Sequence, residues 1–254
     1  MRRRDGRRRV WRMQKTILMI VALVGCGTTS WISDPSNLNN VKIEKAIRIA
    51  TKKPTGKLAK VDLEKVTRLN LRDNQLTDVK GLEKLTQLTE LYLTDNQLTD
   101  VTGLEKLSQL MFLHLHNNKL TDVKVLENLT KLQRLYLQNN QITDISALKE
   151  LKQLEKLHLA DNQISDVSAL SELTKLSYLD LQNTKISDVS SFRKLKGLNN
   201  LDLKGNQISD VDPLKQLTKL TELELNDNPA LTKAQIDELK KALPKCDIRS
   251  NPKK

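Results

Sequence analysis

Apolar residues return with a period of 22 positions from Val66 to about residue 231. Within each period two leucines flank a single variable residue, as in Leu91-Tyr92-Leu93. This alternation predicts a short strand that buries both leucines and exposes the residue between them. Further leucines, such as Leu82 and Leu85, follow at a spacing of three and predict the buried side of the return path. A repeat of this length predicts stacked coils whose strands form one parallel sheet.

Two polar columns run through the repeats, an asparagine column with one interruption and an aspartate column with none. They consist of Asn74, Asn96, Asn118, Asn140, Asn162, Asn206 and Asn228, and of Asp78, Asp100, Asp122, Asp144, Asp166, Asp188 and Asp210. A buried asparagine can satisfy backbone groups that a tight turn leaves open, and aspartate suits the N-cap of a 3₁₀ turn on the outside of each coil. Both columns are therefore interpreted as structural. Thr184 takes one asparagine position and predicts a local weak point.

The complete repeat, L-x-x-L-x-L-x-x-N-x-[LI]-[TS]-D-[VI]-x-x-L-x-x-L-x-x, resembles the 22-residue leucine-rich repeats of the internalin family. The resemblance covers residues 66–231, about seven and a half copies. It implies an α/β solenoid, an arc with a concave parallel β-sheet, a convex side of 3₁₀ or irregular turns, and helical caps. It also implies a protein ligand on the concave face, which such repeats commonly use for binding.

Both ends of a stacked array must be covered. Residues 41–65 predict a helical N-terminal cap, because their apolar residues have helical spacing until Pro54 and Gly56 interrupt it. Residues 232–254 predict the C-terminal cap, with Thr232 as the N-cap of a helix that Pro244 ends. Cys246-Asp247-Ile248 suits a last short strand, and Cys246 is interpreted as a buried residue of this cap.

Residues 1–25 are interpreted as a targeting leader. Eight basic residues and one acid precede an uncharged apolar run from Ile17 to Val24, which is too short to span a bilayer and is typical of a secretory signal. The run ends in Leu23-Val24-Gly25-Cys26, which resembles the lipobox of bacterial lipoproteins. The resemblance implies cleavage before Cys26, lipidation of Cys26 and a lipid-anchored protein of the bacterial cell envelope.

Residues 26–40 are rich in Ser, Thr and Asn and predict a flexible tether between the lipidated cysteine and the N-terminal cap. Gly27 follows the lipidated position, and by analogy with lipoprotein sorting it favours the outer membrane where the cell has one. A plain secreted protein with an incidental Cys26 and a twin-arginine signal are the alternatives. A second possible start at Met13 would shorten the leader.

The outward residues of the strands align into three columns that hold all the histidines and tyrosines of the chain. Tyr, Phe, His and Arg side by side are typical of an interaction surface, because rigid aromatic side chains bury a large area at low entropic cost. The candidate partner-binding residues are Tyr92, Phe112, His114, Arg134, Tyr136, His158, Tyr178, Asp180 and Asp202. The surface is basic at Arg68 and Arg72 and acidic at its other end. We expect a protein ligand of opposite polarity.

Other interpretations of the same columns remain. Aromatic residues favour strands in their own right. Aromatics with Asp and Asn also suit carbohydrate, which makes a peptidoglycan binder the second hypothesis and a structural envelope component without a specific ligand the third. His158 lies two coils from His114 and His116, too far for the three to converge on a metal, so we expect neither metal nor other cofactor. We also expect no enzymatic activity, because the known phosphate-loop, nucleophile-elbow, kinase and zinc-protease motifs are missing from the sequence.

The charge of the chain changes the picture once the leader is considered separately. A net charge of +12 would favour nucleic acid or an anionic membrane as partner. The leader carries +7 of this charge, which leaves +5 for residues 26–254. We therefore expect no nucleic-acid partner, and we expect a monomer. Aromatic residues make up 3% of the chain, so their concentration in the outward columns favours a role for that face.

Overall fold

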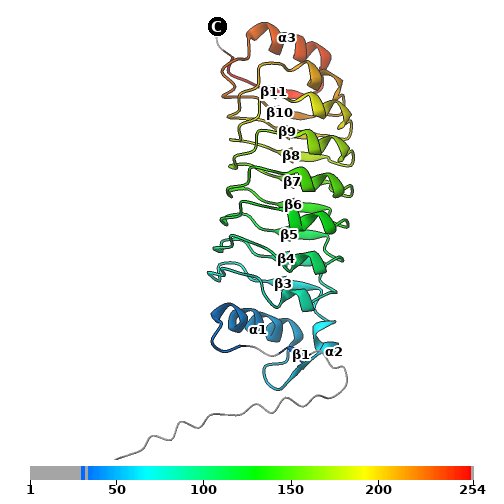
Figure 1. Cartoon of the computed structure of the whole chain (residues 1–254). Coiled ribbons are helices and arrows are strands. Elements are labelled where there is room, and N and C mark those ends of the chain that lie inside the picture. The colour runs from blue at the N-terminus through cyan, green and yellow to red at the C-terminus, as the bar shows by residue number, and fades with distance from the viewer. Residues whose placement is uncertain (1–29, 32–33, 253–254) are drawn as a thin grey trace, which may run out of the picture.

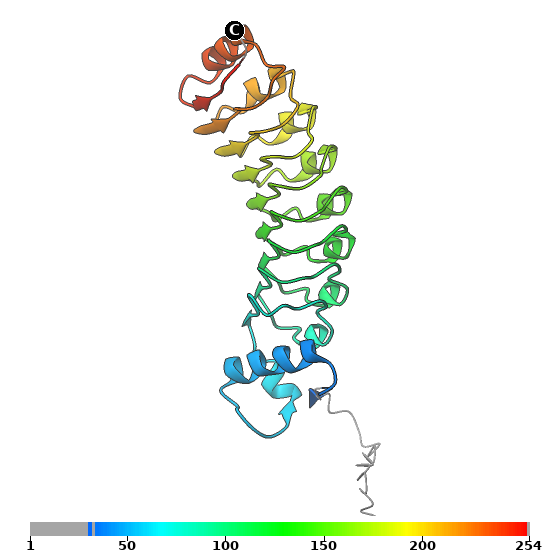
Figure 2. The ribbon, with the colours of Figure 1, turned by 90° about the vertical axis from the view of Figure 1, so that its left-hand side faces the viewer.

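The computed structural model describes residues 30–31 and 34–252. Stacked coils form an array with a helical cap at each end (Figure 1), and the side view shows that the array is curved (Figure 2). The leader, Cys26 and most of residues 26–33 lie outside the described residues. No described helix is long and apolar enough to cross a membrane.

Nine short strands form one parallel sheet in the order β11-β10-β9-β8-β7-β6-β5-β4-β3. The strands are β3 (Arg68–Asn70), β4 (Glu90–Tyr92), β5 (Phe112–His114), β6 (Arg134–Tyr136), β7 (Lys156–His158), β8 (Tyr178–Asp180), β9 (Asn200–Asp202), β10 (Glu222–Glu224) and β11 (Asp247–Arg249). From β3 to β10 each residue pairs with the residue 22 positions away, so the sequence period sets the register. The central leucines of these strands are buried. The expected solenoid with a parallel sheet is confirmed.

The opposite side of each coil is a short 3₁₀ helix, and Figure 2 shows these helices along one edge of the array and the strands along the other. The helices are η1 (Leu82–Lys84), η2 (Leu104–Lys106), η3 (Lys124–Asn128), η4 (Ser146–Glu150), η5 (Ser168–Glu172), η6 (Ser190–Lys194) and η7 (Asp212–Gln216). The aspartate column lies next to them but not at the N-cap. Asp144 precedes the N-cap Ile145, and its carboxylate accepts the N–H of Ser146 at 2.7 Å. Each aspartate thus forms an Asx turn, in which its carboxylate accepts the backbone N–H two residues further along the chain.

The asparagine column forms a buried ladder that joins neighbouring coils. The Nδ2 of Asn140 donates to Leu137 O at 2.9 Å in its own coil and to Leu115 O at 3.1 Å in the preceding coil. Its Oδ1 accepts the N–H of Leu120 at 3.0 Å, again from the preceding coil. One side chain therefore satisfies backbone groups that the buried turn cannot pair by itself.

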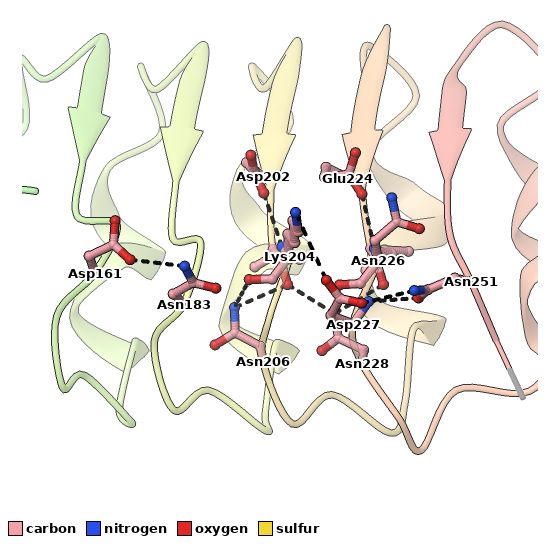
Figure 3. Close-up of polar contacts among 12 residues, drawn as sticks. Asp161, Asn183, Asp202, Lys204, Asn206, Glu224, Asn226, Asp227, Asn228 and Asn251 are labelled. Atoms are coloured by element: carbon pink, nitrogen blue, oxygen red, sulfur yellow. Dashed lines mark hydrogen bonds and ion pairs between the residues drawn. The ribbon is translucent and has the colours of Figure 1, made fainter.

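The residue before each ladder position has a left-handed backbone, with φ between 51° and 59° at the non-glycine positions from Asp73 to Asp227. Asp, Asn and Gly occupy all eight of these positions, and they are the residues that tolerate this conformation best. Side chains at several of these positions form a second, exposed ladder, which Gly205 interrupts and in which Asn183 donates to Asp161 at 2.9 Å (Figure 3). Asn251 continues it past the last strand by accepting the N–H of Asp227 at 2.6 Å.

Thr184 leaves a gap in the buried ladder. Its hydroxyl lies 3.0 Å from Leu181 O and 2.7 Å from the Oδ1 of Asn206, but it has one proton to donate. Ile164, the residue whose N–H would bond an asparagine at position 184, is fully buried, and its N–H has no hydrogen-bond partner among the described residues. The contact between the coils of β7 and β8 therefore lacks the two hydrogen bonds that a regular asparagine makes to the preceding coil.

The N-terminal cap consists of β1 (Ser30–Trp31), α1 (Leu38–Thr51), β2 (Leu58–Ala59) and α2 (Lys60–Leu63). Strands β1 and β2 pair antiparallel, and Ile43 and Ile47 of α1 are buried against the array. Trp31, expected in the tether, is 4% exposed and lies against Gly81. Gly81 has φ of 100°, and a Cβ there would collide with the indole ring. The cap thus includes residues that the sequence assigned to the tether.

The C-terminal cap consists of α3 (Lys233–Ala242) and the edge strand β11. Thr232 and Gln235 cap α3 reciprocally, and Ile236 and Leu239 face the core. The helix and the last strand lie where the sequence predicts them. Cys246 is only partly buried, not fully as expected, and burial raises the pKa of its thiol to about 11.

Replacing Thr184 by asparagine tests the energetic value of the ladder. Thr184→Asn supplies an acceptor for the N–H of Ile164 and should stabilise the array by about 1 kcal/mol, measured by urea unfolding. The reverse change in a regular coil, Asn140→Thr, should destabilise the array by a similar amount or more. An unchanged or lower stability of Thr184→Asn would contradict the role given to the ladder.

Candidate functional site

The candidate surface is built by the outward residues of β3 to β10. The parallel register places equivalent residues of successive coils beside each other, so that Tyr92 pairs with His114, and Tyr136 pairs with both His114 and His158. Because adjacent strands lie about 4.8 Å apart, flat rings in one column are held near stacking distance.

Five rings form a continuous stack along this column. The ring centroids are 4.6 Å apart for Tyr92 and His114, 4.1 Å for His114 and Tyr136, and 4.6 Å for Tyr136 and His158. Interplanar angles in these pairs are 21°, 9° and 18°. Tyr178 extends the stack from the adjacent column, 4.6 Å from His158, because β8 places Asp180, which has no ring, beside His158 in the column of the other four. We call these five residues the aromatic ladder.

Two histidines near the centre of the aromatic ladder, His114 within it and His116 beside it, have lowered pKa values. Burial lowers the pKa of His114 to about 4, with smaller contributions from the positive charges of His116 and Arg72. Burial also lowers the pKa of His116, whose Nδ1 lies 3.3 Å from the Thr94 hydroxyl. Within the ladder, His114 is therefore a polar, uncharged group at physiological pH.

The end of the ladder at β3 is basic. The guanidinium groups of Arg68 and Arg72 lie 5.0 and 4.7 Å from the ring centroid of Tyr92, within cation–π range. The hydroxyl of Tyr92 donates to Glu90 at 3.1 Å, and burial, with the hydrogen bond to Glu90, raises the pKa of this tyrosine.

The opposite end is acidic. Asp180 Oδ2 lies 3.5 Å from His158 Nδ1, and Asp202, Glu222 and Glu224 continue the outward columns. Burial raises the pKa of Asp202, and Asp180 and Glu224 add to the rise through charge repulsion. A shallow depression of about 110 Å³ lies here; its lining includes Tyr178, Asp202, Glu222, Glu224, Asp247 and Arg249.

The structure brings most of the predicted surface residues together. Tyr92, His114, Tyr136, His158 and Tyr178 form the aromatic ladder, and Asp180 and Asp202 lie at its acidic end. Phe112 and Arg134 form a separate pair in the adjacent column, with the guanidinium 5.1 Å from the ring centroid. Sequence reasoning missed Asp247 and Arg249, which line the acidic depression from β11. The sequence does contain a signal for them, because it predicts a last short strand at Cys246-Asp247-Ile248. The outward residues of that strand extend the columns of the repeats.

The three histidines do not converge on one point. The ring centroids of His114 and His116 are 6.0 Å apart in an edge-on arrangement, and His114 and His158 lie on opposite faces of Tyr136. Among the described residues, no group of three or more His, Cys, Asp or Glu side chains is arranged to hold a metal ion.

The repeats match a known family along most of the chain. Residues 64–106, 108–150, 152–194 and 196–241 each match the family model of leucine-rich repeats in two copies. The chain belongs to the leucine-rich-repeat family. No curated protein sequence matches it significantly.

Solved structures place this leucine-rich-repeat protein among internalin-like arrays. Internalin C2 of Listeria monocytogenes is 30% identical with a TM-score of 0.78, over 85% of this chain and 97% of that one. A leucine-rich-repeat protein of Leptospira interrogans is 32% identical with a TM-score of 0.70, over 74% of this chain and 50% of that one. The chain thus spans about half the length of the Leptospira protein. The ectodomain of the Arabidopsis thaliana receptor kinase GASSHO1/SCHENGEN3, solved in complex with Casparian strip integrity factor 2, is 25% identical with a TM-score of 0.56, over 68% of this chain and 24% of that one.

The low pKa of His114 predicts that acid destabilises the leucine-rich-repeat array. The unfolded chain binds a proton at this imidazole near pH 6.5 and the folded chain near pH 4, so stability is lost as pH falls through this window. His114→Gln keeps a flat polar side chain without this titration. The loss of unfolding free energy between pH 7 and pH 5, measured with urea, should be smaller in the variant. An equal loss in parent and variant would contradict the prediction.

Proposed function

We propose that this leucine-rich-repeat protein is a lipid-anchored binding module of the bacterial envelope, which takes a protein ligand on its concave face and has no enzymatic activity. The aromatic ladder is the observation that carries the proposal. It offers a preformed row of rigid side chains, half-buried and fixed by their neighbours, which lose little entropy when a ligand covers them.

The polarity of the surface supports a protein ligand with a fixed orientation. Arg68 and Arg72 lie at one end of the ladder, and Asp202, Glu222 and Glu224 lie at the other. A ligand with acidic groups at one end and basic groups at the other would be attracted in a single register. The Arabidopsis leucine-rich-repeat ectodomain in complex with its integrity factor supports a protein partner by analogy.

The geometry of the rings disfavours the carbohydrate alternative. A sugar packs its apolar side on the face of an aromatic ring, but the faces of His114, Tyr136 and His158 are covered by their neighbours at 4.1–4.6 Å. A ligand can therefore reach only the edges of these rings. The edges carry hydroxyl and nitrogen groups, which suit hydrogen bonds to a polypeptide.

Removing the tyrosines tests the proposed binding face. The triple variant Tyr92→Ala, Tyr136→Ala, Tyr178→Ala should weaken capture of envelope proteins from the organism that carries the chain, by about tenfold or more for each tyrosine that is a binding hot spot. The measurement is a pull-down with identification of partners by mass spectrometry, followed by titration of the identified partner.

A matched control changes exposed residues of the 3₁₀ side, Lys106→Ala, Lys124→Ala and Lys149→Ala, and should bind like the parent. Circular dichroism is used to check that both triple variants are folded. If the tyrosine variant keeps every interaction of the parent, the concave-face proposal is wrong. Glycan-array binding that depends on the same tyrosines would favour the carbohydrate alternative instead.

The proposed anchor rests on the sequence of the leader. A basic segment, an apolar run and Leu23-Val24-Gly25-Cys26 occur in the order of a bacterial lipoprotein signal. Two or three acyl chains on Cys26 would hold the protein stably at a membrane, where one chain would be marginal. Gly27 favours the outer membrane in a cell that has one.

Metabolic labelling with a radioactive fatty acid tests the anchor. The parent should incorporate label, and Cys26→Ser should lose it. Cys246→Ser is the matched control, because it removes the other cysteine and should keep the label of the parent. Label that persists in Cys26→Ser would refute lipidation at this residue.

A further inference from the structure

Exposed apolar side chains gather at one end of the molecule. Within residues 30–31 and 34–252, the exposed large hydrophobic residues are Leu38, Val41, Ile49 and Val61, with exposed fractions of 70%, 42%, 70% and 57%. All four belong to the N-terminal cap, the first three to α1 and the last to α2. No large apolar side chain of the described repeats or of the C-terminal cap is exposed, so this exposure is a local feature and not a general property of the surface.

Helix α1 has apolar residues on two opposite sides. Ile43 and Ile47 face the array and are fully buried. At 100° per residue, Leu38, Val41 and Ile49 fall on one stripe opposite to them, together with Lys45. A depression of about 400 Å³ along this stripe is lined by Val41, Glu44, Lys45, Arg48, Ile49 and Pro54. We call Leu38, Val41, Lys45 and Ile49 the outer stripe.

Positive charge is concentrated in the same cap. Residues 34–65 carry eight basic and four acidic side chains, a net charge of +4, whereas residues 66–254 carry 27 basic and 26 acidic ones, a net charge of +1. Ion pairs within the described cap join Arg48 to Glu44, Lys53 to Asp62 and Lys60 to Glu64. Lys45 and Lys52 are exposed and take part in none of these pairs.

The first described residues of the chain lie at this end. Strand β1 begins at Ser30, and Trp31 is buried in the cap. Ser30 follows Cys26 by four positions, which span at most about 14 Å in an extended chain. A lipid attached to Cys26 would therefore hold the N-terminal cap close to the bilayer, and the apolar, basic composition of the outer stripe suits the boundary between anionic headgroups and acyl chains.

We propose that the outer stripe of α1 lies on an anionic phospholipid bilayer, with Leu38, Val41 and Ile49 at the acyl boundary and Lys45 and Lys52 at the headgroups. This contact adds to the proposed anchor at Cys26 and keeps the N-terminal cap at the membrane. The C-terminal cap, at the other end of the array, stays away from the bilayer (Figure 2).

Tryptophan quenching by brominated phospholipid tests the contact in the full chain reconstituted in vesicles. Ile49→Trp places the reporter on the outer stripe, and Lys240→Trp is the matched control, because residue 240 is also an exposed helical position with basic neighbours but lies in α3. After subtraction of the signal of the parent protein, measured in the same vesicles, the reporter at 49 should lose about half or more of its fluorescence in anionic vesicles. The reporter at 240 should lose little.

A charge variant separates the headgroup contribution. Lys45→Glu with Lys52→Glu, in the Ile49→Trp background, should reduce the quenching in vesicles containing phosphatidylglycerol and leave it unchanged in vesicles of phosphatidylcholine alone. Equal quenching at positions 49 and 240, or none at either, overturns the proposal.

The bilayer proposal would also be overturned if the outer stripe were covered by the leader of the same chain or by a second copy of the chain. If the leader of the same chain covers the stripe, the reporter at 49 emits at short wavelength before vesicles are added. If a second copy covers it, light scattering shows a dimer that Ile49→Ser disrupts. The fatty-acid experiment on Cys26 is independent: label without quenching refutes the bilayer contact alone, and quenching without Cys26-dependent label refutes the anchor alone.

Discussion

The whole array depends on satisfying the backbone of a turn that is buried once per coil. Each coil must reverse between the sheet and its 3₁₀ side, and the buried N–H and C=O groups at that point have no water to bind. A single asparagine side chain supplies both a donor and an acceptor, and it reaches one coil back to do so, as Asn140 does with Leu115 and Leu120. Turn closure and coil stacking are thus one interaction, which explains why the position varies so little.

The same need for hydrogen-bond partners at the turns applies at the two ends of the array, where a neighbouring coil is missing. Asn74 has no regular coil before it and is only partly buried, so α1 supplies the contacts instead. Asn39 of α1 bonds to Thr77 and Asp78, and Lys42 donates to the carbonyl of Asn74. At the other end Asn251 completes the exposed ladder after β11. Each cap therefore supplies hydrogen bonds that a further coil would otherwise make.

The sequence predicts the parts of this structure that the repeat determines. The period of 22 fixes the strands, their register and the burial of Leu113 or Leu135, because these depend on contacts that recur in every coil. It also predicts which residues share the outward columns. It does not predict that Tyr178 joins the ladder from a neighbouring column, because that depends on how one ring leans toward His158.

Features without a repeat were harder to foresee. The small, polar residues around Trp31 predict a tether, yet Trp31 fills space over Gly81 that is specific to the cap. Cys246 was expected to be buried, but it stands at the edge of the array, where no further coil covers it. The exposed apolar side of α1 does not follow from the sequence for a related reason, since helical spacing alone does not tell which of two apolar sides meets the core.

Thr184 and the aromatic ladder meet at the same joint of the molecule. The missing hydrogen bond at Ile164 weakens the seam between the coils of β7 and β8, and the pair His158 and Tyr178 bridges this seam on the concave side. We therefore expect this joint to bend more easily than the joints between the regular coils, with the His158–Tyr178 contact bridging it on the concave side. A ligand that contacts both His158 and Tyr178 would stiffen the joint between the coils of β7 and β8. Ligand binding would then change how easily the array bends, and bending of the array would change the affinity for the ligand.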